Sequence, residues 1–272
     1  RSIGIRLKAD RTHPSVRVTA RIRNALEQYS TYDLGRLDSN GWTVLEASLG
    51  FGTRQTLQYS RPLALVSLRL DETGGSRRLK GGSILIDDIR VTTDTSETIV
   101  IERFDVADAW SVLKTTPNAA FDSIQAVNVG GGQDPGSVIF SWTDGAPQTA
   151  RGIFHGRGRS SLPVLASKSY AQAAGRDQGE EFEVVIAGQM VPVRLLETVE
   201  LFPTVTNLNQ KFLVADLDSL IRYASLGTAS QEVNPNELWI SAPGADFTGA
   251  IYRFTFDSDT RTFGAVIKIT NT

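Results

Sequence analysis

The feature that most constrains the fold is a period-two alternation of apolar and polar residues, which recurs in short runs through the first half of the chain. Residues 3–7 and 16–22 show it most clearly. Successive side chains of an extended strand point to opposite faces, so the pattern predicts strands with one apolar and one polar face. Turn-forming residues separate the runs at 10–14, 38–41 and 71–75, as expected for short antiparallel strands.

Further runs of the same kind continue to residue 142. Many short strands with no convincing helix between them are typical of a sandwich or jelly roll. We therefore predict a mainly β protein in which residues 1–145 form an antiparallel β-sandwich. The additional strands are predicted at 42–49, 63–70, 83–91, 98–104, 123–129 and 137–142.

A smaller α+β domain is predicted at 162–272, after a glycine-rich linker at 146–161. Ser167 and Asp216 are suitable N-caps for two short helices, and Gly175 can end the first of them. The predicted elements are a strand at 162–165, a helix at 167–174, a hairpin at 178–199, a strand at 212–215, a helix at 217–224 and strands at 238–241, 250–256 and 263–269.

Composition excludes several classes of function. The charges nearly balance, with 28 Lys and Arg against 30 Asp and Glu, which gives no reason to expect nucleic acid as a partner. The absence of cysteine excludes disulfides, thiolate metal sites and cysteine nucleophiles. No apolar run approaches the ~18–20 residues of a membrane span. Because the sequence begins at Arg1 without a methionine, we expect a fragment of a larger protein.

Four segments of the first half carry a family resemblance, and the last of them, an apolar strand ending in paired aspartates, is the most telling. The segments are Val18-Thr19-Ala20-Arg21-Ile22-Arg23-Asn24-Ala25, Leu34-Gly35-Arg36-Leu37, Gly41-Trp42-Thr43-Val44-Leu45-Glu46-Ala47 and Gly82-Ser83-Ile84-Leu85-Ile86-Asp87-Asp88-Ile89. They are similar to strands of galactose-binding-like jelly rolls, the kind used as carbohydrate-binding modules. The resemblance covers residues 1–145 and implies a jelly-roll sandwich.

Aromatic side chains in this half are candidates for ligand binding. Trp42, Trp110, Tyr29 and Tyr32 could supply a flat apolar platform for a sugar ring. Burial is the simpler interpretation for Trp42 and Trp142, which lie in alternating strands, because aromatic residues dominate protein cores.

The paired aspartates Asp87 and Asp88 could bind calcium through their carboxylate oxygens. Adjacent residues of a regular strand point to opposite faces, however, so one side chain alone would face any such site. We prefer a structural role for the pair, and predict neither a metal site nor a cofactor.

Five segments of the second half occur in an order and spacing that identify a second resemblance. They are Leu162-Pro163-Val164-Leu165-Ala166-Ser167-Lys168-Ser169-Tyr170, Val184-Val185-Ile186-Ala187-Gly188-Gln189-Met190-Val191-Pro192-Val193-Arg194, Leu201-Phe202-Pro203-Thr204, Phe212-Leu213-Val214-Ala215-Asp216-Leu217 and Asn236-Glu237-Leu238-Trp239. Together they resemble the extracytoplasmic (MacB-like) domain of FtsX/MacB-type ABC transporter permeases.

This resemblance implies partners that the chain itself lacks. Such permeases are membrane proteins that work as dimers with a cytoplasmic ATPase, and their outer domains guide a lipid, lipoprotein or peptide or transmit motion to a partner. The chain departs from the usual pattern because flanking membrane helices are missing and a large jelly roll precedes the small domain. The cargo is therefore left open.

Catalysis is not predicted. His13 precedes a proline in an expected turn and His155 lies in the expected linker, without neighbours at metal-ligand spacing. The carboxylate pairs of possible glycosidase type, which are Asp71-Glu72, Glu180-Glu181 and Asp216-Asp218, fall at expected turns or helix caps, where acidic residues are ordinary.

Walker motifs are absent from the sequence, so ATP chemistry would belong to another chain. The preferred hypothesis is a non-catalytic extracytoplasmic segment of a permease, tethered to the cytoplasmic membrane at the cell surface or in the periplasm. It would bind or guide cargo or a partner and pass motion to the membrane part. The alternative is a secreted carbohydrate-binding or adhesion module of a glycan-processing protein, with a glycan as its ligand.

Overall fold

The computed structural model describes residues 1–49, 62–73, 80–105, 109–114, 121–127, 136–145, 151–156, 161–186, 189–200, 202 and 209–227. Contacts divide the chain into two units, Arg1–Gln231 and Glu232–Thr272. The second unit, with the strands predicted at 238–241, 250–256 and 263–269, lies outside the described residues. The predicted domain boundaries therefore stay a prediction.

The first sheet is antiparallel throughout and has the order β4-β1-β6-β10-β9. β6 is long enough to pair with β10 through its first half and with β7 through its second half. The strands of this sheet are β1 (Ser2–Ala9), β4 (Thr43–Ser48), β6 (Gly82–Thr92), β7 (Thr98–Glu102), β9 (Ser123–Val127) and β10 (Ser137–Trp142).

The second sheet is also antiparallel and has the order β3-β2-β5-β11-β8. It places strands that are far apart in sequence side by side, because β11 pairs with β5. Its strands are β2 (His13–Arg23), β3 (Tyr29–Leu37), β5 (Ala64–Glu72), β8 (Trp110–Val112) and β11 (Arg151–His155).

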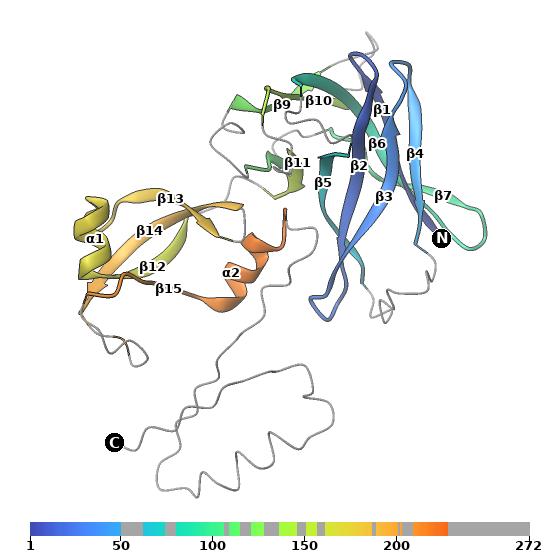
Figure 1. The fold of residues 1–272 in the computed structure, drawn as a ribbon. Coiled ribbons are helices and arrows are strands. Elements are labelled where there is room, and N and C mark those ends of the chain that lie inside the picture. Colours follow the sequence, from blue (N-terminus) through green and yellow to red (C-terminus); the bar gives the residue numbers. More distant parts are fainter. Residues whose placement is uncertain are drawn as a thin grey trace, which may run out of the picture. The chain divides into compact units, whose positions relative to one another are not determined.

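One hydrophobic core lies between these two sheets, which are drawn in blue to green in Figure 1. The alternating residues that predicted the strands supply it: Ile3, Ile5 and Leu7 from the first sheet are buried in one cluster with Val18 and Ala20 from the second. Each sheet therefore hides its apolar face against the other. The fold is mainly β, with an antiparallel sandwich in its first part.

A third sheet has four strands in the order β13-β14-β12-β15 and carries two short helices. β12 and β14 are parallel, and the other two pairs are antiparallel. This arrangement is the smaller α+β part of the fold (Figure 1). Its elements are β12 (Leu162–Ser167), α1 (Lys168–Ala174), β13 (Glu181–Ile186), β14 (Gln189–Val199), β15 (Leu213–Ala215) and α2 (Leu217–Ala224).

Both helix caps occur where the sequence predicted them. The Ser167 hydroxyl accepts a hydrogen bond from the Tyr170 N–H at 3.1 Å, and the Asp216 carboxylate accepts one from the Ser219 N–H at 2.9 Å. Gly175 ends α1 with a positive φ of 61°, a conformation that glycine adopts without strain. The start of both helices and the end of α1 were therefore predicted correctly from the sequence.

One face of the four-stranded sheet is buried and the other is open. Val164 of β12 and Val191 and Val193 of β14 form a cluster with Leu220 of α2, while Ala166 and Leu195 pack with Ala171 of α1. Both helices thus lie on the same face. The opposite face is formed by residues such as Pro163, Arg194 and Leu196, which are exposed.

The periodicity missed three strands: β3, β8 and β11. β11 is the largest correction, because residues 151–155 were predicted as part of the linker and are instead a strand of the sandwich. Four of its five residues are buried, so it shows none of the alternation that marks a half-exposed strand.

Within the described residues, no helix is long and apolar enough to span a membrane.

The packing of β11 can be tested at two glycines with the same φ, Gly152 within β11 and Gly156 directly after it. Gly152 and Gly156 both have φ of 149°, but a Cβ at Gly152 would lie 1.9 Å from the Leu68 carbonyl oxygen, whereas a Cβ at Gly156 would come no nearer than 3.5 Å to the Phe154 ring. We expect Gly152→Ala to lower the free energy of unfolding in urea by about 3 kcal/mol or more, from the clash added to the strain. Gly156→Ala should cost about 1 kcal/mol. Equal effects would contradict the placement of β11.

Candidate functional site

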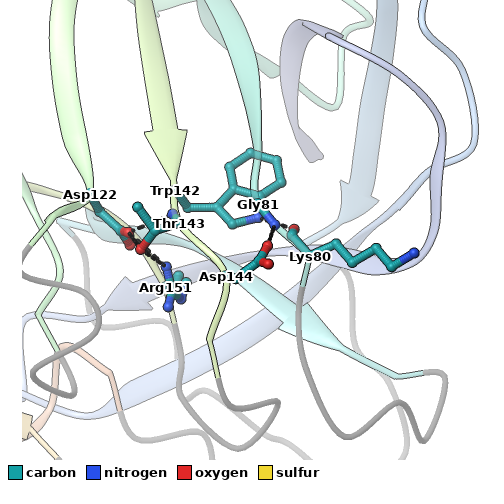
Figure 2. A network of polar contacts seen from close by, with 7 residues as sticks. All are labelled: Lys80, Gly81, Asp122, Trp142, Thr143, Asp144 and Arg151. Atoms are coloured by element: carbon teal, nitrogen blue, oxygen red, sulfur yellow. Dashed lines mark hydrogen bonds and ion pairs between the residues drawn. The ribbon is translucent and has the colours of Figure 1, made fainter.

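Polar groups from several loops gather around Trp142, the last residue of β10 (Figure 2). The indole N–H of Trp142 donates a hydrogen bond of 2.8 Å to the Lys80 carbonyl oxygen. The next residue but one, Asp144, accepts a hydrogen bond from the Gly81 N–H. These two bonds fasten the segment before β6 to the segment after β10. We call the following group of residues the Trp142 cluster: Trp142, Lys80, Gly81, Asp144, His13, Asp10, Asp122, Thr143 and Arg151.

His13 is part of this cluster. It was predicted to be an exposed turn residue, and this prediction was wrong. Its side chain is 6% exposed, its Nε2 lies 2.8 Å from Asp10 Oδ1, and its ring centroid lies 5.2 Å from that of Trp142. A Cβ at Gly82 would lie 2.7 Å from the His13 ring, so glycine is needed there for the close approach. The histidine is therefore a packed residue of the sandwich end.

The carboxylate partner of His13 is perturbed by its surroundings. Burial raises the pKa of Asp10, but the hydrogen bonds from His13 and from backbone groups outweigh burial and hold the pKa below its ordinary value. Asp10 is therefore kept as a hydrogen-bond acceptor. This role fixes the orientation of the imidazole ring.

A buried ion pair joins the two sheets at the same end. Arg151 at the start of β11 donates from Nη1 to Asp122 Oδ1 at 2.6 Å, and both side chains are 0% exposed. The Thr143 N–H donates to the same oxygen at 3.0 Å (Figure 2). A Cβ at Gly145 would lie 1.9 Å from Arg151 Nη2, so glycine leaves the space that the guanidinium occupies.

The pair is not fully satisfied within the described part of the chain. Asp122 Oδ2 and Arg151 Nε and Nη2 are buried and accept or donate no hydrogen bond there. Burial is the largest influence on the pKa of Asp122 and raises it above its ordinary value, although the Thr143 N–H and the charge of Arg151 act to lower it. The cost of desolvating the carboxylate thus exceeds the gain from its partners.

What the Trp142 cluster can do chemically is mainly to hold loops in place. In the described residues His13 is in contact with Asp10, Trp142 and Gly82, and Asp10 holds the imidazole ring through its hydrogen bond. Sequence reasoning missed Arg151 and Asp122 as a pair because each stands in a stretch without periodicity. A charged residue at the start of a buried apolar run, as in Arg151 to Phe154, was the available signal.

The predicted aromatic platform is divided between distant parts of the sandwich. Tyr29 and Tyr32 belong to β3 and Trp110 to β8, which are the two edges of the second sheet. Four strand spacings of ~4.8 Å separate these edges by roughly 19 Å. Trp110 is only 4% exposed and packs on Phe104 and His155, so it offers no free face for a ligand.

Trp42 differs from the other candidates because 37% of its surface is exposed. The prediction that it is a core residue was therefore wrong, whereas Trp142 is buried as predicted. The Arg6 guanidinium lies over the Trp42 ring, 4.7 Å from its centroid, on the outer face of the first sheet. Trp42 is thus the exposed member of the four candidates, since Trp110 is buried and Tyr29 and Tyr32 are half-buried.

Asp87 and Asp88 lie on the same face of the sheet, contrary to the prediction from regular alternation. The register of β1 and β6 shifts here, so that Arg6 pairs with Asp88 and Leu7 with Ile86. This bulge adds one residue to β6 and turns both carboxylates to the outer face. Asp87 pairs with Arg6, and Asp88 with Arg90.

At least one residue of each candidate carboxylate pair has a structural partner. Asp71 accepts from Thr19 and Arg69, Glu180 pairs with Arg176, and Asp216 caps α2. His155, predicted in the linker, ends β11 with its ring edge against Trp110. No group of three or more His, Asp or Glu side chains that could hold a metal ion occurs in the described ranges.

The fold and site define a class of protein, a β-sandwich combined with a smaller α+β sheet, but not a family. Comparisons of the chain with protein-family models, with curated proteins and with solved structures found no match. Its function is therefore argued from the residues.

The structural role of the buried ion pair predicts strongly unequal effects of single and double substitutions. Arg151→Met should lower the free energy of unfolding by about 3–5 kcal/mol, because Asp122 is left buried without its partner. Arg151→Met combined with Asp122→Asn should regain much of that loss, since no charge is then buried. Urea unfolding measures both.

A matched control is the exposed ion pair of Lys168 and Glu200. Lys168→Met should change the free energy of unfolding by about 0.5 kcal/mol or less. A double variant no more stable than Arg151→Met would show that the guanidinium stabilises the fold by packing and not by compensating the Asp122 charge.

Proposed function

We propose that this chain is the non-catalytic extracytoplasmic part of an FtsX/MacB-type ABC permease, in which it binds or guides cargo or a partner and passes motion to the membrane part. The observation that carries the proposal is the order of the α+β elements. A strand and helix, β12 and α1, are followed by the hairpin β13–β14 and by a second strand and helix, β15 and α2. Three of the five segments that resemble the permease domain, at 162–170, 184–194 and 212–217, contribute to these elements.

The α+β sheet also has the surface that such a role requires. Both helices cover one face, so the other face is available to a cargo or to another subunit. This open face combines apolar and charged groups, among them Leu196, which is 47% exposed, and Arg194.

This role implies particular partners and a location. The chain would be held at the outer side of the cytoplasmic membrane by the transmembrane helices of the parent permease, and a cognate ATPase subunit would supply ATP hydrolysis. A lipid, lipoprotein or peptide would be the cargo. The buried ion pair and the capped helices would make the domain rigid enough to transmit motion.

The test uses the full-length product of the source gene. We expect apolar spans of ~20 residues in the parent protein, recovery of the protein in the membrane fraction, and copurification of an ATP-hydrolysing subunit. Recovery of a secreted protein with no span would contradict the proposal.

Variants of the open face test the coupling role in that assembly. Arg194→Glu combined with Leu196→Glu should lower cargo-stimulated ATP hydrolysis about 2- to 30-fold, the range that residues coupling two sites commonly give. Lys8→Glu, an exposed change on the outer face of the sandwich, is the matched control and should have no effect. Equal rates for all three proteins would argue against a coupling function of this face.

A secreted glycan-binding module is the second candidate, and one observation favours it. Trp42 presents an exposed ring next to Arg6, with Asp87 paired to the same arginine. An aromatic face flanked by hydrogen-bonding groups suits the apolar face and hydroxyl rim of a sugar.

The two tryptophans distinguish this candidate from simple packing. Trp42→Ala should abolish saturable sugar binding, measured by calorimetry or on a glycan array, while changing stability little. Trp110→Ala should cost about 3–5 kcal/mol of stability, because it empties a buried site. Sugar binding that survives Trp42→Ala, or no sugar binding at all, would remove the glycan candidate.

A further inference from the structure

The residues that follow helix α2 connect the four-stranded sheet to the sandwich. α2 packs against its own sheet through Leu220 and Tyr223. Leu226 comes directly after the C-cap Ser225, and its N–H donates to the Tyr223 carbonyl oxygen at 3.4 Å. The Ser225 N–H donates to the Ile221 carbonyl oxygen at 2.8 Å. These bonds fix Leu226 to the end of the helix, so it must move with the helix and the sheet beneath it.

The Leu226 side chain packs on the sandwich. It is 5% exposed and forms an apolar cluster with Leu113, Phe154 and Val66. Phe154 of β11 and Ser67 of β5 lie opposite each other in the ladder, and both alternate with neighbours buried in the sandwich core, so they face the outer side of the second sheet. The buried Ser67 hydroxyl donates a hydrogen bond of 2.8 Å to the Leu226 carbonyl oxygen. Leu226 is therefore held by its side chain and by its backbone.

A second contact lies next to the first, because Lys114 follows Leu113 in the chain. The Met190 N–H donates to the Lys114 carbonyl oxygen at 3.1 Å, and Lys114 Nζ lies 3.9 Å from Glu183 Oε1. Met190 belongs to β14 and Glu183 to β13. The two residues directly after β8 thus contact both the end of α2 and the hairpin of the four-stranded sheet.

These contacts are few for two parts of this size. Among the described residues, no strand or helix of one part packs along an element of the other. One buried aliphatic side chain favours the attached arrangement by roughly 10- to 150-fold, and one ordinary hydrogen bond by roughly 2- to 10-fold. The exposed pair of Lys114 and Glu183 adds little. Interfaces this limited allow the parts that they join to move relative to each other.

We propose that Leu226 is a releasable latch, which attaches the α+β part to the outer face of the second sheet and whose release lets the two parts move separately. Leu226 fits this role because it is rigidly fixed to α2 and inserts into a site made entirely by the sandwich. The latch depends on these contacts alone and not on the proposed permease role, for which it would be a point where motion passes between the parts.

The test uses a native pair of residues as the reporter in the 272-residue chain. A zero-length carbodiimide crosslinker joins an amine to a carboxylate in contact with it, so Lys114 and Glu183 should be crosslinked when the latch is closed, as read by peptide mass spectrometry. Leu226→Asn puts an amide among apolar side chains and should lower this crosslink about tenfold or more. Leu217→Asn, the same change at the exposed start of α2, is the matched control and should leave it unchanged.

A second crosslink shows whether the α+β part itself stays folded. Lys168 and Glu200 form an ion pair within that part, and their crosslink should survive Leu226→Asn. If both crosslinks are lost, Ser67→Ala decides, because it weakens the latch from the sandwich side. The loss of both, or of neither, in Ser67→Ala at the urea concentration that half-opens the native latch would then overturn the proposal. An unchanged Lys114–Glu183 crosslink in Leu226→Asn would also overturn it.

Urea tests the release of the latch in the native chain. The crosslink of Lys114 with Glu183 should disappear at a lower urea concentration than that of Lys168 with Glu200, because local opening precedes unfolding of a packed core. Loss of both crosslinks at the same concentration would show that the two parts unfold as one body, and would contradict a releasable latch.

Discussion

The burial of one apolar face of each sandwich sheet against the other is the interaction on which the rest of the structure depends. A fully buried aliphatic side chain contributes about 1.5–3 kcal/mol, and the core contains such residues from both sheets. Neither sheet could hide its inner face alone, so strands as distant in sequence as β5 and β11 must be brought together.

Polar groups at the end of the sandwich define how the two sheets meet and add little to the driving force. The ion pair of Arg151 and Asp122 loses its hydration and leaves several of its polar atoms without a partner among the described residues, so its formation costs a large part of what the attraction gains. Its value lies in specificity, because any other position of β11 would leave a charge buried alone. The close contacts of Gly82 with the His13 ring and of Gly145 with the Arg151 guanidinium also restrict how the two sheets can meet.

The four-stranded sheet also buries one face, but against two helices and not against another sheet. The hairpin β13–β14 was predicted from the alternation of Phe182, Val184 and Ile186, and the caps at Ser167 and Asp216 limited both helices correctly. What the pattern did not give was the parallel pairing of β12 with β14, because a strand's neighbours depend on the path of the whole chain. The open face, on which the proposed coupling role rests, follows from that pairing.

The sequence by itself determined the mainly β class, most strand positions of the sandwich and both helices of the smaller sheet, because alternation and capping are local properties of neighbouring residues. Only the tertiary structure decided the exposure of Trp42, the burial of His13 and the common face of Asp87 and Asp88. The same holds for β11, because its residues carry no alternation and its identity as a strand depends on burial by other segments of the chain. Burial of a single residue is fixed by segments far away in the chain, and a one-residue bulge reverses the face of every residue that follows it.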